Sequence, residues 1–520
     1  MKRYISLLAG SAILASTVAT ADTTAAANIN PDPYGTPWIA NLPELTPEQE
    51  AMLKNLPEIK LNEEQAASPE SLPSTVDNSQ NIHFRPIFSQ IGGSCGQASG
   101  IGYTFTYEMS LARNLDAGLA ENQYPEHHTW NFLNGGSGGG SWYYNGWDII
   151  RDNGIPNVNT YGGMSTSSPY TEWMSGYDKY YAGMSNRTLN YFRIDVSTAE
   201  GIETLKQWFD NRTDGSAIGG IGNFACYVSN SDDAVLESDS ARAGETIIKR
   251  FGNSGYHAMT FVGYDDDVKV DINGDGQYTN NIDINDDGVV DVKDWEIGAV
   301  KIANSWGTGW GNNGYKWLSY SALAHSLGNG GITNTDVHVL NVKESYTPSM
   351  TLKVTMEHSS RNKISIKAGV ASSENATSPE HYTSYQSFNY KGGDHPMRGE
   401  STDPIEIGLD VTSLVGAIGG IENAKKFFLI INENDSNNAA SGLVSSVSAI
   451  NYLNGGIEYA ATTDTVIQNN TETVIPVNLS EQGACSEFTA TNSEHETAGR
   501  AYSETVTEGE TCYGTFCFGG

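Results

Sequence analysis

The tract from residue 304 to residue 315, NSWGTGWGNNGY, constrains the fold of this 520-residue chain more than any other segment. Apolar runs flank it at 299–303 and 314–319, and each has the composition of a short strand. The glycines and tryptophans in the tract predict a turn between those strands. We therefore expect Asn304 at the end of a strand, directly before a tight turn.

Cys95 precedes a stretch with the pattern of a buried helix, at 96–113. The sequence Gly-Gly-Ser at 92–94 allows the backbone to turn sharply and a substrate to approach closely. A cysteine attacks as its thiolate, and the N-terminus of a helix favours that negative charge. Most cysteines in such positions are inert packing residues, so catalysis requires a partner base.

His257 opens an apolar strand predicted at 257–264. A histidine there is more often structural than catalytic. A neutral amide such as Asn304, accepting from the imidazole, would fix its tautomer and orientation. Together the residues suggest Cys95 as nucleophile, His257 as acid/base and Asn304 as orienting residue.

The three segments resemble the papain-like cysteine peptidase family. The most specific match is the tract 304–315, followed by the histidine strand 257–264 and the segment Gln90-Ile-Gly-Gly-Ser-Cys95. The order Cys, His, Asn and the long gap before the histidine also agree. The resemblance covers residues 72–344. Two features depart from the family: the segment from Gln90 to Cys95 is shorter, and the usual cysteine before and aromatic after the nucleophile are absent.

The resemblance implies an α+β, papain-like two-subdomain fold with a helical half and a β-barrel-like half. It implies hydrolysis of protein or peptide substrates through an acyl-enzyme thioester, with no cofactor for catalysis. Gln90 and the Cys95 N–H would form the oxyanion hole, and Trp306 would shield the Asn304–His257 bond. Gly138, Gly139 and Gly140 would bind the substrate backbone. One alternative is a catalytically weak papain-fold binding or adhesin-like protein; another is a transglutaminase-like enzyme, disfavoured because its third residue is normally a carboxylate.

An acidic insert at 265–296 contains two stretches with calcium-loop spacing. The second places oxygens at loop positions 1, 3, 5, 9 and 12 and Gly288 at position 6, whereas the first has Ile282 at position 12. We expect a structural Ca²⁺, with Asp283 serving both loops; the alternative is a solvated acidic hairpin. The predicted ligands are Asp271, Asn273, Asp275, Asp283, Asn285, Asp287, Asp291 and Asp294.

The rest of the chain divides by composition. Residues 1–21 have the basic start, short apolar core and small-residue end of a secretory signal peptide, which predicts a secreted protein without stable membrane insertion. Residues 22–71 are predicted to be a pro-segment or linker, with a helix at 46–54 capped by Thr46, Pro47 and Gln49. The peptidase domain is predicted at 72–345, with a second helix at 198–209 and a further strand at 216–221.

Short β runs at 351–356, 363–368, 405–409 and 427–432 predict a β-sandwich accessory domain at 346–480, whose ligand would be extracellular or on a cell surface. A small module at 481–520 contains Cys485, Cys512 and Cys517, where one disulfide is expected. The formal net charge of −33 argues against a nucleic-acid partner, because phosphates would be repelled.

Overall fold

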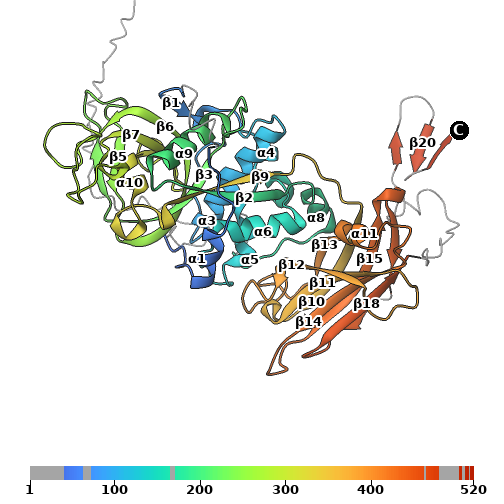
Figure 1. Cartoon of the computed structure of the whole chain (residues 1–520). Helices are drawn as coiled ribbons and strands as arrows, with labels where there is room; N and C mark the ends of the chain where they lie inside the picture. Colours follow the sequence, from blue (N-terminus) through green and yellow to red (C-terminus); the bar gives the residue numbers. More distant parts are fainter. Residues whose placement is uncertain are drawn as a thin grey trace, which may run out of the picture.

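A computed structural model describes residues 40–61, 72–163, 170–461 and 464–479, and the backbone of three short strands between 503 and 519. Figure 1 shows a mainly β half, a helical half beside it, and a β-rich region beyond the helical half. The predicted signal peptide and Cys485 lie outside the described residues. Within those residues, no helix has the length and apolar character needed to cross a membrane.

The helical half begins at Cys95. Its elements are α3 Cys95–Gln97, the π-helical η2 Ala98–Phe105, α4 Thr106–Ala112, η3 Ala120–Asn122, α5 Glu126–Leu133, α6 Tyr143–Asn153, α7 Val158–Tyr161 and α8 Tyr177–Gly183. The other helices are α1 Pro47–Lys54, η1 Asn78–Gln80, α9 Ala199–Asn211, η4 Val292–Asp294, α10 Tyr320–Ala324, η5 Leu327–Asn329, η6 Thr333–Thr335, η7 Arg361–Lys363, α11 Thr412–Ala417 and η8 Tyr452–Asn454.

The β half is built on a sheet of nine described strands in the order β2-β9-β3-β6-β7-β8-β5-β4, with β1 paired to β6. All pairs are antiparallel except β5 with β8. The strands are β1 Thr75–Asp77, β2 Thr188–Asp195, β3 Gly222–Ser229, β4 Asp232–Val235, β5 Thr246–Arg250, β6 Ser254–Lys269, β7 Ile297–Ala303, β8 Tyr315–Ser319 and β9 Asp336–Val342.

The β-rich region contains two antiparallel sheets, ordered β13-β10-β15-β16 (with β17 on β15) and β12-β11-β14-β18. Its strands are β10 Met350–His358, β11 Ile364–Ala371, β12 His381–Asn389, β13 Ile405–Asp410, β14 Lys426–Glu433, β15 Gly442–Asn451, β16 Ile457–Ala460, β17 Thr465–Val466 and β18 Glu472–Asn478. A separate small sheet comprises β19 Ser503–Thr505, β20 Glu510–Tyr513 and β21 Phe516–Gly519, with Cys512 opposite Cys517 in register.

The helical half and the β-rich region share one hydrophobic core. The Phe388 ring contacts Phe132 and Trp173, with centroids 5.5 and 5.7 Å apart. A buried ion pair joins Arg187 to Asp410 across the same boundary. A second core fills the space between the nine-stranded sheet and α9. The β-rich region is therefore packed into the molecule and is not a module on a flexible tether.

Most predicted elements are present, so the mixed helix and strand content confirms the α+β class. Thr46 caps α1 with the predicted capping box to Gln49, and the helix predicted at 96–113 appears as α3, η2 and α4. The strand predicted at 216–221 is wrong, because β3 begins at Gly222. Gly220 instead donates its N–H to the Trp208 carbonyl at the end of α9, which turns this segment around the helix.

Candidate active site

The fold places Cys95 at the first residue of α3, with its side chain fully buried. Nearby backbone N–H groups, among them those of Ala258, Gly96 and Asn41, favour a negative charge on its sulfur and so lower its pKa. Ala258 immediately follows His257 on β6, so the nucleophile candidate and the histidine strand meet at this point. Glycine is needed at position 96, because a Cβ atom there would lie 2.0 Å from the Ser141 carbonyl oxygen.

His257 and Asn304 are joined by a hydrogen bond, with 2.8 Å between His257 Nε2 and Asn304 Oδ1. Since an amide oxygen only accepts, Nε2 carries the proton and Nδ1 of the neutral ring is left as a base. Nδ1 has no hydrogen-bond partner among the described residues. Asn304 follows β7, and its Oδ1 also accepts the Ser305 N–H at 2.7 Å. The amide therefore fixes both the tautomer and the orientation of the ring.

Burial controls the protonation of both groups in this structure. It lowers the pKa of His257 to about 4, against the opposing effect of the hydrogen bond that His257 donates to Asn304. Burial also raises the pKa of the Cys95 thiol, although surrounding backbone N–H groups oppose that rise. Burial thus favours the neutral form of both groups while the site is covered.

Gln90 lies beside the same turn and is 2% exposed. Its Nε2 donates to the Gly92 carbonyl at 2.9 Å, and its Oε1 accepts from Ser305 Oγ at 2.7 Å. The primary amide has two hydrogens, so one remains for a developing oxyanion. The sequence did not identify Ser305 as the residue that fixes the rotation of this amide.

Trp306 packs its ring beside the His257 ring, with centroids 4.5 Å apart. An aromatic ring in this place excludes water from the histidine.

Gly138, Gly139 and Gly140 lie in the loop before α6, where Trp130 Nε1 donates to the Gly139 carbonyl at 2.9 Å. A Cβ atom at Gly93, two residues before the nucleophile, would lie 2.8 Å from the Gly138 carbonyl oxygen. The glycine loop and the nucleophile turn are thus neighbours.

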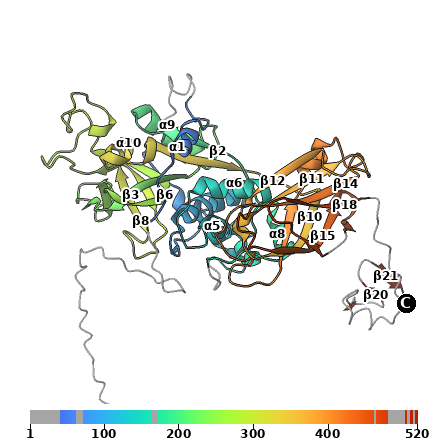
Figure 2. The same ribbon diagram turned by 90° about the horizontal axis from the view of Figure 1, so that it is seen from below.

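Residues 40–45, which precede α1, cover this site and are called here the covering segment. The Leu42 N–H donates to the Tyr256 carbonyl at 2.9 Å, and Trp142 Nε1 donates to the Pro43 carbonyl at 2.9 Å. A Cβ atom at Gly140 would lie 2.2 Å from the Asn41 carbonyl oxygen. The segment thus contacts both the glycine loop and the histidine strand. It leads into α1, which lies at the boundary between the β half and the helical half in Figure 2. Nothing in its sequence had indicated these contacts.

The acidic insert forms two loops with the same internal hydrogen bonds. Asp271 accepts from Gly276, and Asp283 accepts from Gly288, each at 2.9 Å. Asp294 accepts from the N–H groups of residues 284 and 285, and Glu296 accepts from those of 272 and 273. Glu296 therefore occupies in the first loop the place that Asp294 has in the second.

These bonds differ from the sequence expectation that Asp283 would complete both loops. Glu296 lies outside the twelve-residue spacing, so the pattern could not reveal it. Among the described residues, no three His, Cys, Asp or Glu side chains already form a group suited to a metal ion. Asp283 Oδ1 is buried and has no hydrogen-bond partner in the described part of the chain.

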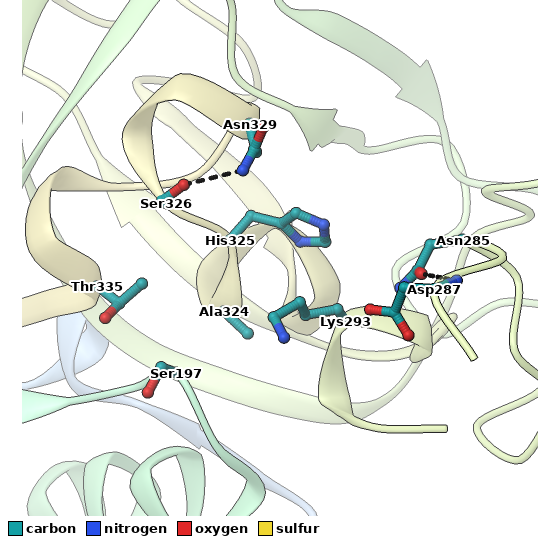
Figure 3. Close-up of a pocket in the computed structure, with 9 residues that line it drawn as sticks. All are labelled: Ser197, Asn285, Asp287, Lys293, Ala324, His325, Ser326, Asn329 and Thr335. Atoms are coloured by element: carbon teal, nitrogen blue, oxygen red, sulfur yellow. Dashed lines mark hydrogen bonds between the residues drawn. The ribbon is translucent and has the colours of Figure 1, made fainter. Parts of the chain in front are cut away.

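A cavity of about 560 Å³ lies beside the second loop, between Asp287, Lys293 and His325 (Figure 3). None of Cys95, His257 and Asn304 lines it. The catalytic candidates are thus separate from this cavity and lie beneath the covering segment.

Comparison with known proteins gives structural neighbours only. The chain is similar to xylellain, a cysteine protease from Xylella fastidiosa, at 13% identity over 58% of this chain and 95% of that one, with a TM-score of 0.37. It is similar to recombinant stem bromelain precursor at 14% identity, over 55% and 74%, with a TM-score of 0.35. It is also similar to digestive procathepsin L2 proteinase from Tenebrio molitor larval midgut at 17% identity, over 58% and 78%, with a TM-score of 0.37.

These neighbours are papain-like cysteine proteases, the family that the sequence motifs resemble. No protein-family model matches the chain, and no curated protein matches it.

Proposed function

We propose that this chain is a secreted cysteine peptidase of the papain type, with Cys95 as nucleophile, His257 as acid/base and Asn304 as orienting residue. The observation that carries the proposal is the 2.8 Å bond from His257 Nε2 to Asn304 Oδ1. It leaves Nδ1 without a partner among the described residues, on a strand that contacts the helix that Cys95 begins. The finer description belongs to the same proposal: a two-subdomain peptidase at 72–345 and an accessory β-sandwich at 346–480.

The chemistry is acyl transfer from a peptide to water. His257 Nδ1 takes the thiol proton, and the Cys95 sulfur attacks the peptide carbonyl carbon. The free hydrogen of the Gln90 amide and the Cys95 N–H stabilise the oxyanion. His257 then gives its proton to the leaving amine as the C–N bond breaks, and water, deprotonated by the same ring, hydrolyses the thioester. The chain supplies every group for these steps, and its substrates are proteins or peptides.

The covering segment makes the described chain a zymogen in this proposal. It lies between the glycine loop and β6, and Cys95 is completely buried in its presence. Asn41 of the segment packs against Gly93 in the nucleophile turn and against Gly140 in the glycine loop, so a substrate backbone cannot occupy that place at the same time. Leu53 of α1 is also fully buried, which anchors the segment. Removal of the segment would return water to the site and allow the ion pair to form.

One experiment tests both the nucleophile and the cover. A recognition sequence for a specific protease, placed within 62–71, allows the chain to be cut after folding. The intact and cut forms are then treated with limiting iodoacetamide from about pH 5 to 8, below the ordinary thiol pKa. Mass spectrometry follows Cys95 and Cys226, and casein hydrolysis is measured in parallel.

We expect rapid labelling of Cys95 at the acid end in the cut form alone, together with casein cleavage. Cys226, which is also buried and free, is the internal control, and Cys95→Ala should abolish cleavage while Cys226→Ala retains it. If Cys95 in the cut form labels no faster than Cys226 and casein stays intact, the protein is better described as a binding protein on a papain-like fold.

We further propose that the two acidic loops bind structural Ca²⁺. The donors are carboxylate and amide oxygens, as Ca²⁺ prefers, and the buried Asp283 Oδ1 has no other partner among the residues that the structure describes. Asp271, Asn273, Asp275 and Glu296 would serve the first loop. The insert joins β6 to β7, the strands that carry His257 and precede Asn304. A bound ion would therefore stabilise the link between two catalytic residues.

A chelator should lower the melting temperature by several degrees, because an ion that binds only the folded state stabilises it. Asp283→Ala should lose the part of this stabilisation that the second loop provides, so its melting temperature should rise less on addition of Ca²⁺ than that of the parent. Asp403→Ala, a change in an exposed turn of the β-rich region, serves as the control. Identical melting temperatures in calcium and in excess chelator would show that the loops bind no stabilising Ca²⁺.

A further inference from the structure

One turn of the β-rich region, residues 390–395, contacts the glycine loop, which spans residues 134–141. His395 Nε2 donates to the Gly136 carbonyl at 3.0 Å. At Gly393, a Cβ atom would lie 2.2 Å from the Gly135 carbonyl oxygen, and at Gly136 a Cβ atom would lie 2.5 Å from the His395 ring. The two turns therefore meet backbone against backbone, an approach that only glycine permits.

The other end of the same loop lines the catalytic site. Gly140 contacts the Asn41 backbone of the covering segment, and Gly138 contacts Gly93 in the nucleophile turn. Between the two ends, the Gly139 N–H and the Gly136 N–H both bond to Asn134, through its carbonyl and its side-chain oxygen. A displacement at Gly136 is thus transmitted to Gly140 through a few bonded residues.

The turn that supports the loop is itself held rigidly. Arg361 is fully buried, and its Nε and Nη2 donate to the Gly392 carbonyl at 2.9 and 2.7 Å. The guanidinium lies 4.3 Å from the centre of the Trp173 ring, and the Arg361 N–H donates to the His395 carbonyl at 2.8 Å. Because these contacts fix the 390–395 turn, the turn in turn fixes the position of the glycine loop that packs against it.

We propose that the 390–395 turn of the β-rich region is part of the substrate-binding wall, and that His395 is a positioning residue for the glycine loop. This inference rests on the proposed peptidase function and extends it. The β-rich region then determines how tightly the enzyme binds a substrate backbone, in addition to any ligand of its own.

Two glycines offer a matched pair of substitutions. Gly393 and Gly455 both have left-handed backbones, with φ of 77° and 78°. A Cβ atom at Gly393 meets the glycine loop, whereas one at Gly455 meets nothing within 4 Å. Gly393→Ala and Gly455→Ala therefore carry similar backbone strain, and only the first displaces the loop.

For the cut enzyme, we expect Gly393→Ala to raise KM for a peptide substrate about fivefold or more while kcat changes less than about twofold. The rate of Cys95 labelling by iodoacetamide, which needs no peptide subsite, should be unchanged. Amide hydrogen exchange in residues 134–141 should accelerate in Gly393→Ala alone. Equal KM values for the two variants would overturn the inference, as would a parallel loss of Cys95 labelling.

His395 provides a second test with a conservative rescue. His395→Ala should raise KM about threefold to fivefold, the usual effect of one hydrogen bond, and His395→Gln should recover most of it because its Nε2 can reach Gly136. His381→Ala, at an exposed histidine of β12, is the control. If the parent enzyme neither labels nor cleaves, the proposed function has failed. In that case the hydrogen-exchange comparison still tests whether the 390–395 turn positions the glycine loop. Equal exchange of residues 134–141 in Gly393→Ala and Gly455→Ala would overturn that inference.

Discussion

At the scale of single residues, the geometry of the site depends on the hydrogen bonds that each polar side chain makes. Asn304 Oδ1 serves two donors, the ring of His257 and the backbone of Ser305, so the amide cannot rotate without breaking both bonds. Ser305 in turn donates to Gln90. Two consecutive residues after β7 thus orient the base and the oxyanion donor from opposite sides.

Asn304→Ala tests this orientation. The substitution leaves His257 free to adopt the other tautomer or to rotate, so kcat should fall by roughly tenfold to a hundredfold. The measurement is peptide hydrolysis by the cut enzyme, with Asn329→Ala at an exposed turn as control. Wild-type kcat in Asn304→Ala would show that the amide has no part in catalysis.

The residues of the triad could be predicted from the sequence because each lies in a short local pattern: a cysteine before a helix, a histidine opening a strand and an asparagine before a Trp/Gly turn. Leu42 and Glu296 could not. Leu42 bonds to a carbonyl far along the chain, and Glu296 reaches its loop from beyond the expected spacing. Long-range contacts of this kind leave no periodic signal.

At the scale of elements, α5 is a helix that buries several titratable residues. Glu126, His127 and His128 open it, and all three are almost completely inaccessible. Burial lowers the pKa of His127 and of His128 to about 3, and burial raises the pKa of Glu126 to about 7. Neither ring nitrogen of His127 has a hydrogen-bond partner among the described residues.

A histidine held neutral in the folded state makes the protein sensitive to acid. Its contribution to stability is complete above pH 6.5, the unfolded value, and is lost as the pH falls toward 3. His127→Phe keeps the ring beside Trp130. We therefore compare the melting temperature of the variant with that of the parent at two pH values. The difference, variant minus parent, should be several degrees larger at pH 4 than at pH 7. His381→Phe is the exposed control, and a difference that does not change with pH would contradict the interpretation.

Other elements differ from the structure that their sequence patterns predict, because tertiary packing determines their backbone conformation. The helix after Cys95 continues as a π-helix over 98–105, where Gly100 and Gly102 bring Tyr143 and Phe88 close to the backbone. The run 216–221 has strand-like composition, yet it wraps the end of α9. By contrast, the runs predicted at 351–356 and 427–432 appear as β10 and β14. The first is identified by its alternation of buried and half-buried residues, and the second by a short continuous apolar run.

At the scale of the whole molecule, the shared core makes the helical half and the β-rich region one thermodynamic unit. A chain that ends at residue 345 would expose the apolar surface around Phe132 and Trp173, which Phe388 covers. We expect that chain to be insoluble or to lose its cooperative transition, and a chain that ends at residue 480 to melt like the parent. Calorimetry and soluble yield measure both. An unchanged transition in the shorter chain would separate the two regions.

The bond between His395 and Gly136 has a further consequence for the order of folding. It joins residues 259 positions apart, and contacts of such long range form late because chain entropy opposes them. During synthesis at about 5 to 20 residues per second, the glycine loop exists for ten seconds or more before its support has been made. The covering segment, in contrast, emerges before everything it covers. The glycine loop therefore acquires its final shape late in folding, when the covering segment has already been synthesised.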